Sequence, residues 1–151
     1  MTNPGVRIPP PAVYILTLVI GWLLQSRWPL PFIAHDVALL SGLPLVAIGL
    51  ALATASIVTM LRGHGTVNTN SQSSALVVSG IYRISRNPMY VALTIMYIGF
   101  ALAIGLPWAL ILLPLLLVYV RTMVIAREEK SLANAFGQQY LDYKARVRRW
   151  L

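Results

Sequence analysis

The segment from Ser79 to Tyr90, S-G-I-Y-R-I-S-R-N-P-M-Y, gathers arginine, asparagine, tyrosine and serine side chains between two long apolar stretches. Polar atoms at the edge of a membrane are costly unless a partner uses them. Guanidinium, amide and hydroxyl groups together suit a ligand that carries both charges and hydrogen-bonding groups. We therefore interpret this segment as part of a binding site for a soluble, charged cofactor.

The rest of the chain offers few alternatives for chemistry. It contains no cysteine and only two histidines, His35 and His64, which excludes disulfides and thiolate chemistry and argues against a metal centre. A Gly-rich phosphate loop, a Ser-His-Asp arrangement and the Rossmann cofactor motif are absent from the sequence. We expect no metal, and a reaction that needs no covalent nucleophile.

The composition is that of a membrane protein. Of the 151 residues, 58% are hydrophobic and only 11% are charged, whereas charged residues make up about a quarter of a soluble domain. A chain of this length makes one domain. We predict an all-α integral membrane protein with a single domain over residues 1–151.

Four apolar stretches have the character of membrane spans. The second runs for 25 residues, Val37 to Leu61, without a charge, enough to cross about 30 Å of hydrocarbon with some tilt. Gly105-Leu106-Pro107 leaves room only for a tight turn, so the last two spans should form a helical hairpin. The predicted spans are 12–26, 37–61, 89–105 and 108–126, with a cytoplasmic loop at 62–88 and an amphipathic tail at 127–151.

Basic residues flank the predicted spans on one side, with only Arg27 opposite. The positive-inside rule then places both termini and the polar segment in the cytoplasm. The net charge of +8 could suggest nucleic acid, but that function needs a basic face on a soluble fold, so we expect no nucleic-acid partner. The residues on the basic side are Arg7, Arg62, Arg83, Arg86, Arg127, Lys130, Lys144, Arg146, Arg148 and Arg149.

The tail has the pattern of an amphipathic helix that bends near Gly137. Its apolar residues recur at steps of three and four, and polar residues occupy the other side. Arg148 and Arg149 beside Trp150 should bring the tail onto an anionic membrane surface, so membrane lipids are expected partners. The apolar side comprises Leu132, Phe136, Tyr140, Tyr143, Val147 and Leu151, and the polar side Lys130, Asn134, Gln138, Asp142 and Arg146.

Two stripes of residues predict how the helices pack. Small side chains at four-residue spacing in the second span predict close helix packing, within the chain or against a second copy, which leaves the oligomeric state open. Polar side chains at i, i+4 and i+7 predict one polar face on the third span. The stripes are Ala47, Ala51, Ala55 and Thr59, and Tyr90, Thr94 and Tyr97.

Arg121 lies inside the fourth apolar stretch. An arginine at this depth either contacts a ligand or extends to the headgroups, and the sequence leaves both alternatives open. On a regular helix Glu128 is offset from Arg121 by only about 20°, so the two should share a face.

The run from Leu76 to Tyr90, L-V-V-S-G-I-Y-R-I-S-R-N-P-M-Y, and the run from Glu128 to Val147, E-E-K-S-L-A-N-A-F-G-Q-Q-Y-L-D-Y-K-A-R-V, resemble the isoprenylcysteine carboxyl methyltransferase family. That family looks related to phospholipid N-methyltransferases and to many bacterial membrane methyltransferases. The resemblance covers roughly the C-terminal half. It implies a prokaryotic inner-membrane enzyme that uses S-adenosylmethionine, releases S-adenosylhomocysteine and methylates a lipophilic acceptor.

Matching positions imply roles for individual residues. Asn87 stands where the family often has histidine, and keeps only neutral hydrogen bonding. The arginine that contacts substrate in the prenylcysteine enzymes falls at Val124, so we predict Arg121, about one turn earlier, as its substitute. The predicted catalytic residues are thus Arg121 and Asn87, and the predicted cofactor-binding residues are Leu76, Val77, Tyr82, Asn87, Pro88, Met89, Tyr90 and Glu128.

Methyl transfer from a sulfonium needs mainly the positioning of two reactants, which agrees with the absence of a metal site and of a nucleophile. Two alternatives stay open. The chain could be a non-enzymatic membrane protein that binds anionic lipid or a partner through its basic tail, or a membrane reductase related to the sterol reductases that uses NADPH. The acceptor, whether carboxylate, amine, thiol or phenol, is not determined by the sequence.

Overall fold

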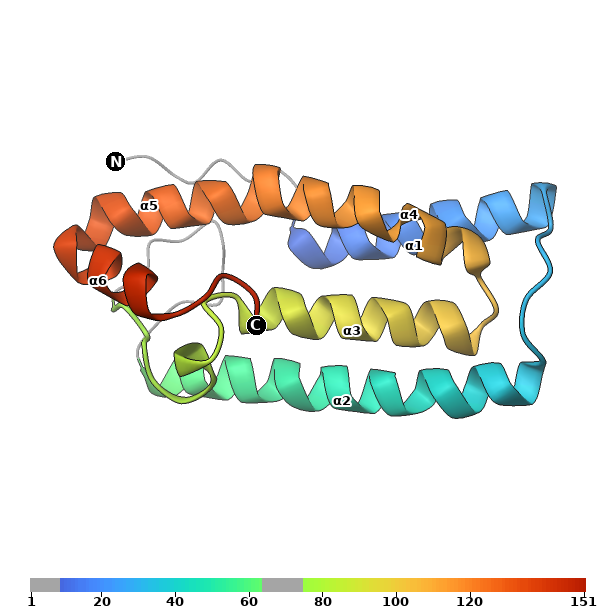
Figure 1. The fold of residues 1–151 in the computed structure, drawn as a ribbon, viewed down its shortest axis with the longest axis horizontal. Coiled ribbons are helices and arrows are strands. Elements are labelled where there is room, and N and C mark those ends of the chain that lie inside the picture. The colour runs from blue at the N-terminus through green and yellow to red at the C-terminus, as the bar shows by residue number, and fades with distance from the viewer. Residues whose placement is uncertain (1–8, 64–74) are drawn as a thin grey trace.

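A computed structural model describes residues 9–63 and 75–151, and within these ranges the ordered elements are all helical. Long helices run side by side along one axis (Figure 1). Arg7, His64 and most of the first half of the predicted 62–88 loop lie outside the described residues. The elements are α1 (Pro10–Arg27), α2 (His35–Arg62), η1 (Gly80–Arg83), α3 (Pro88–Ala103), α4 (Pro107–Tyr119), η2 (Val120–Ile125), α5 (Ala126–Phe136) and α6 (Gln138–Arg146).

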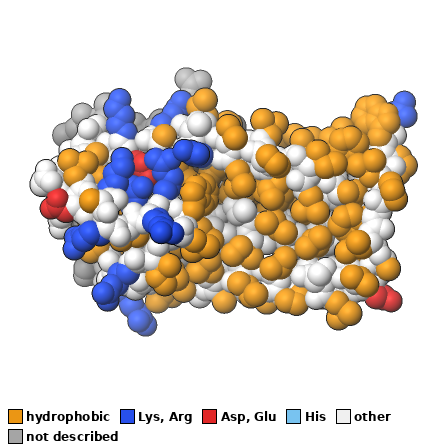
Figure 2. All heavy atoms as spheres, in the orientation of Figure 1, with side chains coloured by type: hydrophobic (Ala, Val, Ile, Leu, Met, Phe, Trp, Pro, Cys, Tyr) orange, Lys and Arg blue, Asp and Glu red, His pale blue; other side chains and the backbone are white. Residues whose placement is uncertain are grey.

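Within residues 9–63 and 75–151, two helices are long and apolar enough to cross a membrane. They are α2 and the continuous helix Pro107–Phe136, with mean hydropathies of 2.2 and 2.3. Only 17% and 28% of their most apolar windows are buried within the protein, so their side chains face outward, unlike those of a soluble core helix. On the face shown in Figure 2, apolar side chains accordingly cover most of the bundle outside the end where Lys and Arg gather. These features define an integral membrane protein, while spans at α1 and at the shorter α3 stay predictions.

Charge is distributed along the bundle as the sequence indicates. Lys and Arg side chains gather at the end that holds α5, α6 and the polar segment (Figures 1 and 2). The opposite end holds the last turn of α1, with Arg27, and the first turn of α2, with Asp36. An apolar band separates the two ends, as a lipid bilayer requires.

Small residues allow α2 and α3 to pack closely, but they are not the residues that we predicted. Ala47, Ala51 and Ala55 are exposed, so this part of the prediction was wrong for packing within the chain. Side chains four residues apart on a helix differ in direction by about 40°, whereas side chains seven residues apart differ by only about 20°. The longer spacing therefore keeps small residues on one face. The buried small residues follow the longer spacing over most of the helix: Ala38, Gly42, Gly49 and Ser56.

Gly42 shows how tight this contact is. A Cβ at Gly42 would lie 2.5 Å from the carbonyl oxygen of Gly99 and 2.6 Å from the amide nitrogen of Ala103. A side chain at this position would therefore push the two helices apart.

The remaining core lies between α1, α3 and α4. Tyr14 of α1 contacts Tyr97 of α3 edge to face, with ring centroids 6.0 Å apart, and Leu116 of α4 completes the buried cluster with them. At the far end, the Trp108 indole donates to the Trp28 carbonyl oxygen over 2.7 Å. These contacts hold α1 against α3 and α4.

The tail bends where predicted, but the apolar side of α6 packs within the protein, and its contact with a membrane surface stays a prediction. α5 ends at Phe136, Gly137 adopts a φ of +53° that favours glycine, and α6 folds back. Tyr140 and Tyr143 of α6 are almost fully buried within the protein, so they are not available to lipid. The apolar side of α6 instead packs on the polar segment, because the tight turn directs it there.

Candidate functional site

The two sequence runs that carry the resemblance meet through a hydrogen bond. The hydroxyl of Tyr90 donates to Oε1 of Glu128 over 2.7 Å, and both groups are partly shielded from solvent. Tyr90 belongs to the first turn of α3, which begins at Pro88, a residue whose fixed φ favours helix starts. Glu128 lies in the first turn of α5. The fold thus brings together one predicted site residue from each run.

Tyr82 lies near this pair. It is buried in η1, and burial, followed by the negative charge of Glu128, raises the pKa of its hydroxyl to about 12. The hydroxyl therefore stays protonated at neutral pH. The backbone of Tyr82 is held from the tail, because the Tyr143 hydroxyl donates to the Tyr82 carbonyl oxygen over 2.7 Å.

Asn87 makes structural contacts that the sequence did not reveal. Its side-chain amide donates to the carbonyl oxygen of Arg149 over 3.0 Å, and its backbone N–H donates to Oγ of Ser85 over 3.1 Å. Its backbone carbonyl oxygen accepts hydrogen bonds from the N–H groups of Tyr90 and Val91. The N–H groups of Tyr90 and Val91 at the start of α3 are thus already bonded, and the catalytic role of Asn87 stays a prediction.

The other predicted cofactor residues differ in burial, and their contact with a cofactor stays a prediction. Val77 is buried, and its side chain lies close to Gly63 at the end of α2. Leu76 and Met89 are half-buried.

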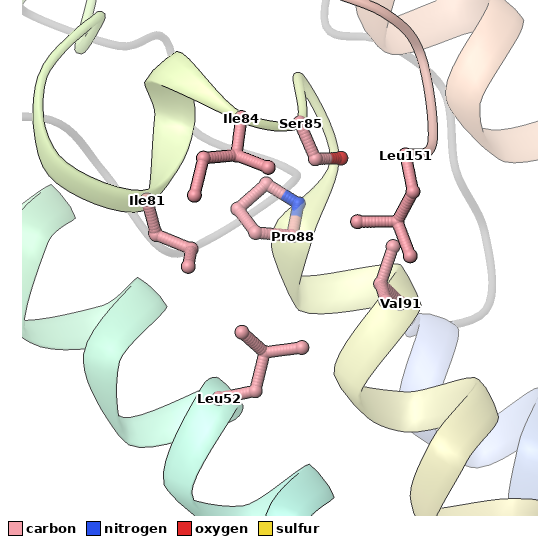
Figure 3. Close-up of a pocket in the computed structure, with 7 residues that line it drawn as sticks. All are labelled: Leu52, Ile81, Ile84, Ser85, Pro88, Val91 and Leu151. Carbon is pink, nitrogen blue, oxygen red and sulfur yellow. The ribbon is translucent and has the colours of Figure 1, made fainter.

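Pro88 borders a separate apolar hollow (Figure 3). The volume of this hollow, about 20 Å³, is far below the ~300 Å³ at which ligand pockets begin. The lining residues are Leu52, Ile81, Ile84, Ser85, Pro88, Val91 and Leu151.

Arg121 and Glu128 do not share a face, contrary to the prediction. The segment between them is a π-helix, in which the Ala126 N–H donates to the Arg121 carbonyl oxygen five residues back. A π turn is wider than an α turn, so it changes the helix phase, which is the direction around the helix axis in which the following side chains point. Arg121 is exposed and Val124 is buried in the core. Acceptor contact by Arg121 stays a prediction.

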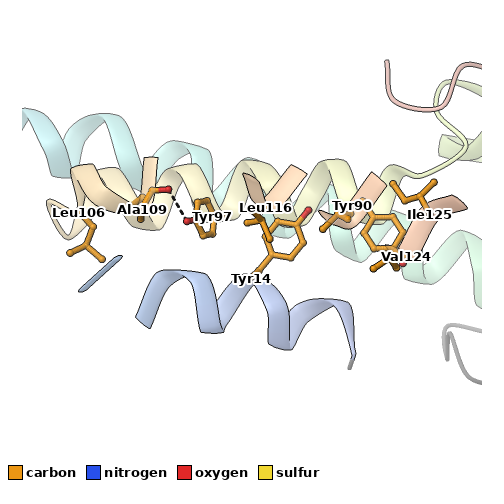
Figure 4. Packing of buried hydrophobic residues seen from close by; sticks show 10 residues of the cluster. Tyr14, Tyr90, Tyr97, Leu106, Ala109, Leu116, Val124 and Ile125 are labelled. Atoms are coloured by element: carbon orange, nitrogen blue, oxygen red, sulfur yellow. Dashed lines mark hydrogen bonds between the residues drawn. The ribbon is translucent and has the colours of Figure 1, made fainter. Parts of the chain in front are cut away.

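The predicted polar stripe on α3 is divided between the site and the core. Tyr97 is buried and its hydroxyl donates to the Ala109 carbonyl oxygen over 2.8 Å (Figure 4). Thr94 donates to the Tyr90 carbonyl oxygen and also bonds the Tyr14 hydroxyl. Of these residues, only Tyr90 directs its polar group to Glu128.

Sequence reasoning missed an ionic cluster centred on Glu129, which is only 7% exposed. The Arg149 guanidinium donates to both carboxylate oxygens, over 2.9 and 2.8 Å. Arg86 lies 3.2 Å from one oxygen and Lys144 lies 3.8 Å from the other. One signal was present: adjacent acids on a helix point about 100° apart, so Glu128 and Glu129 must have different partners.

These observations define an α-helical integral membrane protein with a tyrosine–carboxylate site at the basic end of an apolar bundle. Residues 37–139 match the phospholipid methyltransferase family. The chain belongs to this family, which confirms the relationship suggested by the two sequence runs.

Two relatives extend this result. A protein-S-isoprenylcysteine O-methyltransferase from Xenopus laevis is 36% identical over 84 residues, which cover 56% of this chain but only 29% of the relative. An uncharacterized protein from Haemophilus influenzae is 35% identical over 63 residues, which cover 42% of this chain and all of the relative. No solved structure matches the chain.

Proposed function

We propose that this protein is an integral membrane methyltransferase that moves a methyl group from S-adenosylmethionine to a lipophilic acceptor. The observation that carries the proposal is the 2.7 Å bond between Tyr90 and Glu128. It joins the two runs of the sequence that resemble methyltransferases, within the region that matches the family. A core that needed only to pack would have no reason to place a carboxylate there.

The chemistry of the side chains fits the cofactor. The Glu128 carboxylate can accept hydrogen bonds from ribose hydroxyls or from an ammonium group, and the Tyr82 ring can stack on adenine. The cofactor supplies a methyl group already activated on a sulfonium sulfur. The task of the chain is then to hold the cofactor, to admit an acceptor and to exclude water.

The membrane placement supports a lipophilic acceptor. We propose that α1, α2, α3 and the α4–α5 helix all cross the bilayer, with α3 and α4 as a hairpin and the basic end in the cytoplasm. A soluble cofactor would then arrive from the cytoplasm and the acceptor from lipid. In this proposal the exposed Arg121 holds an acidic group of the acceptor, and Asn87 is a neutral donor at the site.

Calorimetry with S-adenosylhomocysteine tests the proposal on the purified protein. We expect binding that Glu128→Gln and Tyr82→Ala each weaken at least tenfold, which corresponds to about 1.4 kcal/mol, because each removes a group assigned to the cofactor. Matched controls are Asp142→Asn, an exposed acid of α6, and Tyr119→Ala, a more exposed tyrosine of α4. Both controls should bind like the parent.

A folded protein that does not bind the cofactor product, or that binds it equally after both site substitutions, would refute the proposal. The non-enzymatic alternative predicts such an absence, together with salt-sensitive binding to anionic vesicles. Isotopically labelled cofactor incubated with lipid extracts, followed by mass spectrometry, would then identify the acceptor and its methylated atom.

A further inference from the structure

The residues that follow α6 fold back across the polar segment. α6 ends at Arg146, and Val147 is extended, with φ −119° and ψ 133°. The chain then runs to a position beside the start of α3 (Figure 1). We name residues 147–151 the strap.

The strap is bonded to the polar segment mainly through its backbone. The Arg86 N–H donates to the Arg148 carbonyl oxygen over 2.9 Å. The carbonyl oxygen of Arg149 accepts from Oγ of Ser85 over 3.3 Å and from the Asn87 amide over 3.0 Å. Three successive residues of the polar segment therefore hold the strap.

Two side chains of the strap cover the first turns of α3. Trp150 packs against the buried cluster that contains Tyr90. Leu151 lines the hollow beside Pro88 and Val91 (Figure 3). The strap thus lies against residues on either side of Tyr90, the residue that bonds Glu128.

A single ion pair fastens the strap to α5. The Arg149 guanidinium makes the two-pronged contact with Glu129, yet its side chain is 28% exposed. Arg86 and Lys144 pair with the same carboxylate, so Glu129 keeps partners when Arg149 leaves. A short segment beyond the end of a helix, fastened by a partly exposed pair, belongs to the parts of a protein that open most readily.

We propose that the strap is a gate for the cofactor and that the Arg149–Glu129 pair is its latch. This inference rests on the proposed function. A charged cofactor cannot reach Tyr82 and Glu128 through lipid, so it must pass the cytoplasmic face that the strap covers. Opening of the strap then limits both the arrival and the release of the cofactor.

A reversible crosslink tests the gate on the full chain. Ile84 and Leu151 line the same hollow and are 61% and 70% exposed. Because the chain has no cysteine, the variant Ile84→Cys/Leu151→Cys can be bridged selectively by a short bis-methanethiosulfonate reagent. The association and dissociation rates of S-adenosylhomocysteine are then measured by stopped-flow fluorescence, with the equilibrium affinity measured separately.

We expect the bridge to lower both rates at least about tenfold with little change in affinity, as for a lid that gates a site, and reductant to restore them. Each single-cysteine variant treated with the same reagent serves as the control. If the bridged protein exchanges S-adenosylhomocysteine at the parent rate, the proposal of a gate is refuted, and the proposed function is not affected. Absence of binding in the unbridged parent would instead overturn the proposed function, and the gate with it.

The latch is tested without any ligand. Arg149→Gln should accelerate hydrogen exchange at the Arg86 amide, which the strap protects by accepting its hydrogen bond. Arg148→Gln removes the same charge from an exposed side chain one residue away and should leave this exchange unchanged. Equal exchange in the parent and in Arg149→Gln would show that the pair does not hold the strap.

Discussion

At the scale of residues, the site depends on the contrast between two neighbouring acids. Glu128 receives a hydrogen bond from Tyr90 and faces Tyr82. Glu129 pairs with Arg86 and Arg149. The oxygens of the first acid have a neutral partner in Tyr90 and can accept hydrogen bonds from a ligand, whereas the charge of the second acid is already compensated by cations. Only the first therefore suits a role in binding the cofactor.

Tyr90→Phe tests the first of these contacts. The substitution keeps the ring in the core and removes only the hydroxyl that donates to Glu128. Loss of a hydrogen bond to a charged group should weaken binding of S-adenosylhomocysteine by about 1–2 kcal/mol, or roughly five- to thirtyfold. Calorimetry is the measurement, and Tyr119→Phe is the control, because Tyr119 of α4 is 39% exposed. Unchanged affinity in Tyr90→Phe would contradict the role assigned to this bond.

At the scale of elements, close helix packing and one irregular turn position the site. α3 approaches α2 at Gly42 and Gly99, where only hydrogen atoms fit between the helices. The π-helix Val120–Ile125 sets the phase of α5 and thereby determines which acid faces Tyr90. Helical turns of this kind occur frequently at functional sites, because they redirect side chains without ending the helix.

Gly42→Ala should destabilise the protein. The added methyl would lie 2.5 Å from the Gly99 carbonyl oxygen, and overpacking of this kind costs about 1–3 kcal/mol. The free energy of unfolding in detergent measures the effect. Ala47→Leu adds a larger group on the exposed face of the same helix and should change the stability little. A Gly42→Ala protein as stable as the parent would show that the two helices can separate without cost.

At the scale of the whole molecule, charge is distributed unequally between the two ends of the bundle, and this asymmetry is the basis of the proposed orientation. The basic end holds the site, the strap and the tail, and the opposite end holds Asp36 and Arg27. A soluble cofactor and a lipid-borne acceptor need different routes to one site. A site at the end of an apolar bundle provides both, because it borders water on one side and hydrocarbon on the other.

This orientation predicts which surfaces a reagent can reach. In a chain without cysteine, Asp36→Cys should react with a membrane-impermeant maleimide in intact cells, whereas Lys144→Cys should react only after permeabilisation, because we propose that the basic end faces the cytoplasm. The parent chain provides the unlabelled control. The reverse pattern would place the candidate site outside the cytoplasm and contradict the proposed orientation.

The sequence by itself determined the membrane class, the one-sided charge, the helical tail with its bend at Gly137 and the family. These depend on hydropathy, charge and local motifs, which are read from neighbouring residues. Tertiary structure decided which small residues pack, that Tyr97 and Thr94 use their hydroxyls in the core, that Arg121 turns away from Glu128, and that Asn87 and Glu129 hold the strap. Those outcomes depend on helix phase and on contacts between residues distant in the chain. The π turn at Val120–Ile125 changed the helix phase. No local pattern in the sequence predicts this turn.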